Sequence, residues 1–113
     1  MKRDPKVFLF DIIDSIDKIE KYTKNLDKKK FLNNSEKQDS VVKRLEIIGE
    51  AVKNIPKKIK DNNPEIAWKE IAGMRDKLTH EYFGIKMDRV WTTVKKDLPK
   101  FKTQIEKITK ELQ

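Results

Sequence analysis

The sequence contains no cysteine, one histidine, three glycines and four prolines among its 113 residues. Without thiols the chain can form neither disulfides nor thiolate metal sites. Three glycines are too few for the many turns of a β-rich architecture, and no apolar run approaches the roughly 18 residues that a membrane span needs. The N-terminal stretch MKRDPKVFLF is positively charged but has no long apolar region or small-residue cleavage site. We therefore expect no signal peptide, no membrane contact and a cytoplasmic location.

Charged residues make up 41% of the chain and hydrophobic residues 36%, and the formal net charge is +8. This composition fits a helical bundle with a Lys- and Glu-rich surface better than a deeply buried α/β sheet. A chain of this length forms one domain with one modest core, and we expect that domain to span residues 1–113. The basic excess favours a polyanionic partner, either a nucleic acid or an acidic protein, although many Lys-rich helical proteins are basic without one.

Two long helices are predicted in the first half of the chain. Asp4 is a natural N-cap residue and Pro5 a natural first helical residue, which predicts a helix over about residues 5–23. A second helix is predicted over about residues 35–54, and Pro56 closes it. Apolar residues recur at helical spacing in both segments: Phe8, Ile12, Ile16 and Ile19 in the first, and Val41, Leu45, Ile48, Val52 and Ile55 in the second.

The segments around the second predicted helix are polar. Residues 25–38 predict a loop with a short turn, anchored by Phe31 and Leu32, and residues 56–64 predict a connector with about one helical turn. Gly49 lies inside the second helix, where glycine costs about 1 kcal/mol relative to alanine. A glycine in such a position often lets the backbone of another helix approach closely.

The second half predicts a short helix over residues 65–71, an interruption at Gly73, and a new helix over residues 74–82 capped by Gly84. A last helix is expected to kink at Pro99. Its apolar stripe is typical of a bundle core, although its second half can also pack on a partner subunit: Trp91, Val94, Leu98, Phe101, Ile105, Ile108 and Leu112. The predicted fold is an all-α, up-and-down bundle of four principal helices plus a short connecting helix.

The only histidine lies in the stretch MRDKLTHEYFG, residues 74–84. At about 100° per residue on a helix, Arg75 and Tyr82 share one face. Asp76 and His80 share another, so the carboxylate is placed to orient or charge the imidazole. Arg75 and His80 differ by about 140° and cannot converge on one small ligand from a straight helix. Either the helix ends before His80, or two copies of the motif meet across a symmetric dimer.

These side chains suit cleavage of an RNA phosphodiester bond without a metal. A neutral His80 can take a proton from a ribose 2′-hydroxyl or return one to the leaving oxygen. Arg75 can hold the phosphate and stabilise its added negative charge, and Tyr82 can donate a hydrogen bond to a phosphate oxygen or stack on a base. No spacing typical of a metal or cofactor site occurs, so neither is expected. A lone histidine near a helix end is also a common surface residue.

The pattern Arg75-x4-His80-x-Tyr82 resembles the R-x4-H-x-Y signature of HepT-like toxins in the HEPN (higher eukaryotes and prokaryotes nucleotide-binding) superfamily. The resemblance extends over nearly the whole chain, beginning with the Asp-Pro pair that opens an apolar helix. Three further segments are similar to the family's second helix, its motif region and its last helix: RLEIIGEA (44–51), WKEIAGMRDKLTHEYFGI (68–85) and VWTTVKKDLP (90–99). Position 76 is often a polar residue such as Asn in the family, and Asp76 is a close variant whose role stays open.

The resemblance implies an all-α, HEPN-like homodimer whose two motifs line a cleft between the subunits and cut RNA as a metal-independent endoribonuclease. Arg75 and His80 are the implied catalytic residues, and Asp76 and Tyr82 the supporting ones. Family members serve as toxins of type II- or VII-like toxin–antitoxin systems, usually with a minimal nucleotidyltransferase antitoxin encoded next door. That partner can transfer AMP to the motif tyrosine, here Tyr82, and the added charge and bulk would compete with RNA for Arg75.

Other interpretations stay open. A helical dimer that binds a nucleotide, or regulates a nucleotidyltransferase, without cutting RNA is compatible with the same motif, and a plain helical adaptor is a third alternative. Glu46 and Glu50, four residues apart, form a solvated face, or one of them pairs with Arg75 and orients it. The lysine run at 28–30 is typical of solvated surface, with contact to an RNA backbone as the alternative.

Overall fold

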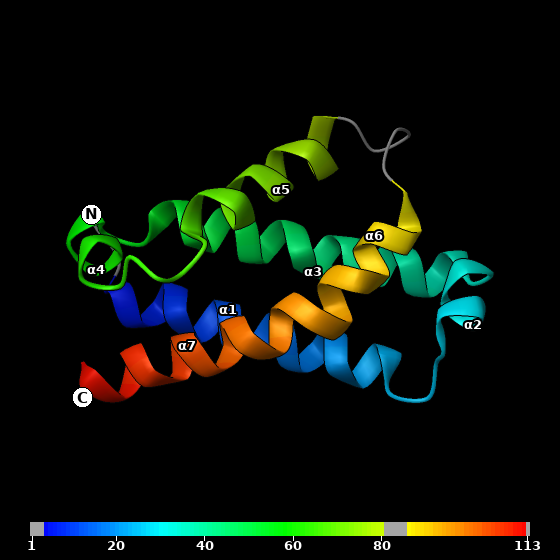
Figure 1. Ribbon diagram of the computed structural model, residues 1–113, viewed down its shortest axis with the longest axis horizontal. Coiled ribbons are helices and arrows are strands. Elements are labelled where there is room, and N and C mark those ends of the chain that lie inside the picture. The colour runs from blue at the N-terminus through cyan, green and yellow to red at the C-terminus, as the bar shows by residue number, and fades with distance from the viewer. Residues whose placement is uncertain (1–3, 81–85, 113) are drawn as a thin grey trace.

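The computed structural model describes residues 4–80 and 86–112, the side chains of residues 79 and 80 excepted. Four long helices dominate these residues and alternate in direction (Figure 1), which confirms the predicted all-α, up-and-down bundle. They are α1 (Pro5–Thr23), α3 (Ser35–Asn54), α5 (Trp68–His80) and α7 (Leu98–Glu111). Nothing in the described ranges forms a β-strand, and none of their helices is long and apolar enough to cross a membrane.

The bounds of α1 and α3 agree with the predicted ones because the local sequence fixes their ends. The Asp4 carboxylate accepts a hydrogen bond from the Lys6 amide at 2.9 Å, and a proline occupies the first turn. Asn34 caps α3 in the same way and accepts from the Lys37 amide at 3.0 Å. At its other end α3 stops before Pro56, whose ring disfavours helical backbone in the preceding residue.

The two predicted connectors each contain a short helix. α2 (Lys28–Leu32) lies within the first one, where a loop with a short turn is predicted. Phe31 is fully buried, as expected of an anchor, whereas Leu32 is 40% exposed and takes little part in the core. α4 (Lys57–Asn62) supplies the helical turn expected in the second connector.

The predicted interruption at Gly73 is wrong, because α5 runs continuously through this glycine. The predicted start at residue 65 is also too early, since α5 begins at Trp68. A glycine inside a helix costs only about 1 kcal/mol, and the packing of α5 along α3 outweighs that cost. The predicted helix end at Tyr82 and its cap at Gly84 lie outside the described residues.

The last helical segment is irregular just before Pro99, where a kink is predicted. α6 (Met87–Thr92) continues into a π-helical turn, η2 (Thr93–Asp97), and then into α7. In this wide turn the Leu98 amide donates to the Thr93 carbonyl, five residues back. Pro99 has no N–H to donate to the carbonyl four residues earlier, so the chain widens its turn just before the proline.

The helices pack in a fixed order, with α3 between α1 and α5, and α1 in contact with α7. Figure 1 shows α4 and the C-terminal end of α7 at one end of the bundle and α2 at the other. At the α2 end of the bundle, α2 contacts α6, and the ring centroids of Phe31 and Trp91 lie 5.2 Å apart. The last turn of α5 points toward this same end (Figure 1).

The predicted apolar stripes form the core, with Phe8 and Trp91 only partly buried at its edge. Ile105 and Ile108 are buried inside this chain, so most of the second half of the last helix packs on its own bundle. Leu112 is the exception at 38% exposure. Trp68 packs edge-on against Phe101, and its indole N–H donates to the Asn63 carbonyl at 3.1 Å, which fixes the start of α5.

Candidate active site

Helix α5 brings Arg75 against α3 at Gly49. A Cβ atom built on Gly49 would overlap the Cβ of Arg75 and would lie 2.9 Å from its Cγ and 3.2 Å from its Cα. Packed side chains do not occupy such distances, so the missing side chain at Gly49 is what lets the two helices meet here. The predicted close approach at Gly49 is therefore confirmed, and the residue that approaches is the motif arginine.

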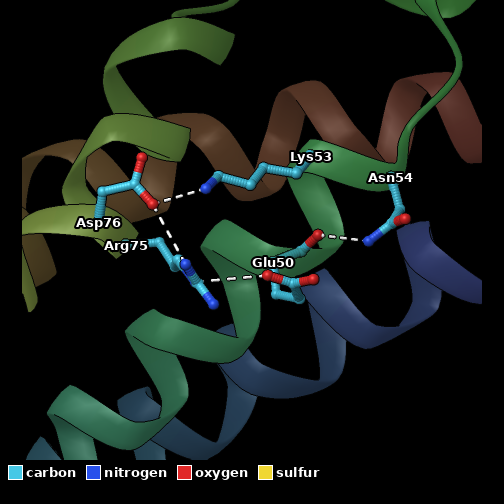
Figure 2. Close-up of polar contacts among 5 residues, drawn as sticks. All are labelled: Glu50, Lys53, Asn54, Arg75 and Asp76. Atoms are coloured by element: carbon cyan, nitrogen blue, oxygen red, sulfur yellow. Dashed lines mark hydrogen bonds and ion pairs between the residues drawn. The ribbon is translucent and has the colours of Figure 1, made fainter. Parts of the chain in front are cut away.

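Two carboxylates contact the Arg75 guanidinium (Figure 2). Glu50 Oε2, on α3, lies 3.3 Å from Arg75 Nε, and Asp76 Oδ1 accepts a hydrogen bond from Nη1 at 3.2 Å. Of the two glutamates considered as partners for this arginine, Glu50 therefore forms the ion pair. Within the described part of the chain nothing pairs with Nη2, so the guanidinium keeps donors for an anion. The Arg75 side chain is 29% exposed, so part of it is accessible to solvent.

Asp76 is held by cations on two helices. Its Oδ1 atom accepts hydrogen bonds from Lys53 on α3 and from Arg75 (Figure 2). These two bonds keep the pKa of the Asp76 carboxyl below its ordinary value, and the bond from Lys53 has the larger effect. The group is therefore ionised at neutral pH. The predicted orientation of His80 by Asp76 stays a prediction, because the imidazole lies outside the described residues.

Glu50 and Lys53 reach α5 from the same face of α3, because residues three apart are neighbours on a helix. Sequence reasoning does not single out Lys53, although its spacing from Glu50 is the signal that could have found it. Asn54 completes this last turn, where its side-chain amide donates to the Glu50 carbonyl at 2.9 Å. Among the described side chains no cluster of three or more His, Asp or Glu residues could hold a metal ion.

The helical geometry separates Arg75 from His80. Two arrangements are predicted that would bring Arg75 and His80 together: a helix end before His80, or a symmetric dimer. The first is wrong, because α5 continues to His80. On a continuous helix the two residues are about 140° apart around the axis and about 7.5 Å apart along it. One α5 helix therefore does not aim both side chains at a single phosphate. Tyr82, the remaining member of the motif, lies outside the described residues.

The bundle and the helix that carries the anchored arginine define an all-α domain of the HEPN-like class. A family model described as ribonuclease HepT-like matches residues 12–108. The chain belongs to this ribonuclease HepT-like family.

Three of its relatives match over nearly their whole length. Two candidate RNases of Methanocaldococcus jannaschii are each 49% identical over 112 residues, which is 99% of this chain and 93% and 97% of theirs. A candidate ribonuclease HepT of Thermococcus cleftensis is 47% identical over 110 residues, 97% of this chain and the whole of that relative. No solved structure gives a significant match. The similarity therefore includes both helices that build the site.

Proposed function

We propose that this chain is a metal-independent endoribonuclease that acts in the cytoplasm as the toxin of a toxin–antitoxin system. Membership of the ribonuclease HepT-like family supports RNA as the substrate, as do relatives described as candidate RNases. The observation that carries the proposal is the anchored arginine. Arg75 is seated on Gly49 and held by Glu50 and Asp76, five residues before the only histidine of the sequence.

The active site is composed of residues from two chains. The continuity of α5 through His80 supports this arrangement, because Arg75 and His80 diverge on one helix. A symmetric homodimer brings two arginines and two histidines to one cleft, so Arg75 of one chain can converge with the partner subunit's His80. The same symmetry provides a second imidazole, which acid–base catalysis with one histidine per chain requires.

The reaction is a transesterification within RNA, in which one oxygen bonds to phosphorus as another leaves. A neutral His80 accepts the proton of the ribose 2′-hydroxyl as that oxygen bonds to phosphorus. The partner subunit's His80, in its protonated form, gives a proton to the oxygen whose bond to phosphorus breaks. Arg75 binds the phosphate oxygens and stabilises the charge that develops on them. Because Glu50 and Asp76 hold Arg75 before RNA arrives, the guanidinium needs little reorganisation during the reaction.

The proposed cognate partner is a minimal nucleotidyltransferase antitoxin. Its transfer of AMP from ATP to the Tyr82 hydroxyl, with release of pyrophosphate, would add a negative charge and a bulky group two residues after His80, where both oppose RNA binding at Arg75. The intact mass of the chain, expressed alone and then with its neighbouring gene, tests this part of the proposal. A mass increase that matches AMP and disappears in Tyr82→Phe supports it, and an unchanged mass of the co-expressed chain contradicts it.

The catalytic assignment is tested by expressing the parent, His80→Ala and Lys69→Ala, and measuring growth and RNA degradation. Lys69 is an exposed residue of α5 at the end away from the motif, so its variant controls for substitution on the same helix. We expect the parent and Lys69→Ala to arrest growth and cut RNA with and without a metal chelator, and His80→Ala to do neither.

Two outcomes would overturn the assignment. RNA degradation by His80→Ala at the parent's rate would exclude the histidine as the proton-transfer group. Purified parent protein that binds nucleotides but never cleaves RNA, with or without added metal, would instead support the non-catalytic nucleotide-binding dimer.

A further inference from the structure

The network around Arg75 has no net charge with which to attract RNA. Arg75 and Lys53 contribute two positive charges, and Glu50 and Asp76 contribute two negative ones at 3.3 Å or less from them. Such a site can hold a phosphate that has already arrived, but its field falls off steeply with distance because the charges cancel. The electrostatic attraction that brings a polyanion to the protein must come from another surface.

The excess charge of the chain is concentrated in two short segments. Residues 24–34 and 86–100 together contain nine basic and three acidic residues, so 26 residues carry a net +6 of the chain's +8. By contrast, the long helices α1 and α3 are each balanced or nearly so, with basic and acidic residues in similar numbers. The two basic segments are far apart in the sequence, and nothing in it indicates that they meet.

The fold joins these segments at one end of the bundle. Helix α2 contacts α6, and the rings of Phe31 and Trp91 pack 5.2 Å apart between them. Lys95 lies over the Trp91 ring, with its Nζ atom 4.7 Å from the ring centroid. We call the exposed basic residues of this end the α2–α6 basic surface: Lys28, Lys29, Lys30, Lys86, Arg89, Lys95 and Lys96.

The charges of the α2–α6 basic surface are not neutralised by ion pairs. Within the described residues, none of its members forms a salt bridge, whereas Lys18, Lys53, Lys57 and Lys102 elsewhere each do. Two nearby acidic groups are engaged by backbone amides, since Asp27 accepts from the Lys30 amide at 2.8 Å and Asp88 from the Arg89 amide at 3.0 Å. The ammonium groups thus remain available to an external anion.

We propose that the α2–α6 basic surface binds the phosphate backbone of single-stranded RNA and leads the strand toward the cleft that contains Arg75. This inference rests on the proposed ribonuclease function. α6 begins seven residues after His80, and α2 precedes the start of α3. From Ser35 at that start to Gly49, which seats Arg75, the distance along α3 is about 21 Å. The surface and the arginine therefore lie close enough for one strand of a few nucleotides to contact both.

The surface fits a nucleic acid better than an acidic protein. Protein interfaces have an apolar centre, but of the three exposed large hydrophobic residues among the described ones, Phe10, Leu32 and Leu112, only Leu32 belongs to α2 or α6. The Trp91 ring already contacts Phe31 and the Lys95 ammonium group, so stacking on a base would have to displace one of them. Contacts through ammonium and guanidinium groups alone predict binding that is independent of base sequence and strongly weakened by salt.

The test measures binding of a short, labelled single-stranded RNA by fluorescence anisotropy at several salt concentrations. All proteins carry His80→Ala, so that the RNA stays intact. An α2 variant has alanine at the three lysines 28–30, and an α6 variant combines Arg89→Ala with Lys96→Ala. A charge-matched control variant replaces three exposed lysines on α4 and the C-terminal half of α7, helices that end away from α2 (Figure 1): Lys58, Lys107 and Lys110.

Each phosphate contact adds about 0.7 to the slope of log affinity against log salt for a single strand. We therefore expect the α2 variant to lower that slope by about 2 and to weaken binding at 0.1 M salt by up to roughly 100-fold. The α6 variant should lower the slope by about 1, and the control variant should behave like the parent. RNAs of different sequence should give the same results.

Failure of this inference can be separated from failure of the proposed function. If the parent with His80 intact cleaves RNA, but the α2 and α6 variants bind with the affinity and slope of the control variant, the inference is wrong and the ribonuclease function stands. If these variants lose RNA binding while the parent never cleaves RNA, the surface stands and the ribonuclease function fails. If the α2 and α6 variants bind RNA as the control variant does but no longer capture the co-expressed antitoxin, the surface binds an acidic protein and the inference is wrong.

Discussion

Replacing Gly49 with alanine should destabilise the protein, although alanine is the better helix former. The gain in helix propensity is about 1 kcal/mol. The added Cβ would overlap the Cβ of Arg75 and lie 3.2 Å from its Cα, and these atoms can move only with the backbone of α5. Overpacking of this kind costs about 1–3 kcal/mol, and such a rigid neighbour favours the upper part of that range. A net loss of roughly 1–2 kcal/mol in the free energy of unfolding follows.

Gly73 provides the matched control, because it is the interior glycine of α5 and its built Cβ meets no atom within 4 Å. Gly73→Ala should therefore stabilise the fold by about 1 kcal/mol. The two variants should differ by roughly 2–3 kcal/mol, which corresponds to about 10 °C or more in Tm for a domain of this size. Thermal and urea unfolding, followed by far-UV circular dichroism, measure this difference.

The result also bears on the site. RNA cleavage measured well below both values of Tm should fall in Gly49→Ala, because the shift of α5 moves Arg75 relative to Glu50, and should persist in Gly73→Ala. A Gly49→Ala protein that unfolds at or above the Tm of the parent would refute the close contact between α3 and α5. Equal changes of stability in the two variants would show that the contact with Arg75 does not distinguish Gly49 from Gly73.

Three further outcomes are expected. Glu50→Gln should cut RNA about tenfold more slowly while its free energy of unfolding falls by less than about 1 kcal/mol, since the ion pair with Arg75 is at the surface; an unchanged rate would show that Glu50 does not position the arginine. Because hydrogen bonds from Lys53 and Arg75 depress the folded-state pKa of Asp76, its stabilising contribution is present above the unfolded pKa of about 3.9 and is lost as pH falls through the lower folded value. The stability difference between the parent and Asp76→Asn, from urea midpoints, should therefore shrink below about pH 4, and a constant difference would contradict this. Trp68→Phe should cost about 1–2 kcal/mol in calorimetry, because it leaves the Asn63 carbonyl without its donor and removes buried ring area.

The sequence predicts a helix end well where one residue dominates the local energy. Asp4 and Pro5 start α1, and Pro56 ends α3. Both helices therefore agree with their predicted bounds. Gly73 misleads because its cost is small against the packing of α5 on α3, a tertiary contribution that no local pattern reveals. At Pro99 the sequence predicts a kink but not the π-helical turn that precedes the proline. The form of this irregularity depends on how α6 and α7 each pack.

The candidate site is partly predictable for the same reason. The motif singles out Arg75 and His80, and Glu46 and Glu50 are both predicted as possible partners of the arginine. The structure places Glu50 3.3 Å from the arginine. The contact of Lys53 with Asp76 depends on the register between α3 and α5, which Gly49 sets and a single sequence does not state. The α2–α6 basic surface depends on a contact between distant segments and therefore appears only in the folded chain.

The central claim is that both chains of a dimer contribute a histidine to each active site. Its most direct test mixes equal amounts of the parent and His80→Ala proteins under conditions that allow subunits to exchange. Half of the exchanged dimers are mixed and lack one of the two imidazoles, so we predict roughly a quarter of the RNA cleavage given by the same total amount of parent protein. Cleavage at about half of that amount, although subunit exchange is verified by mass, would show that each chain acts alone and would contradict the composite site.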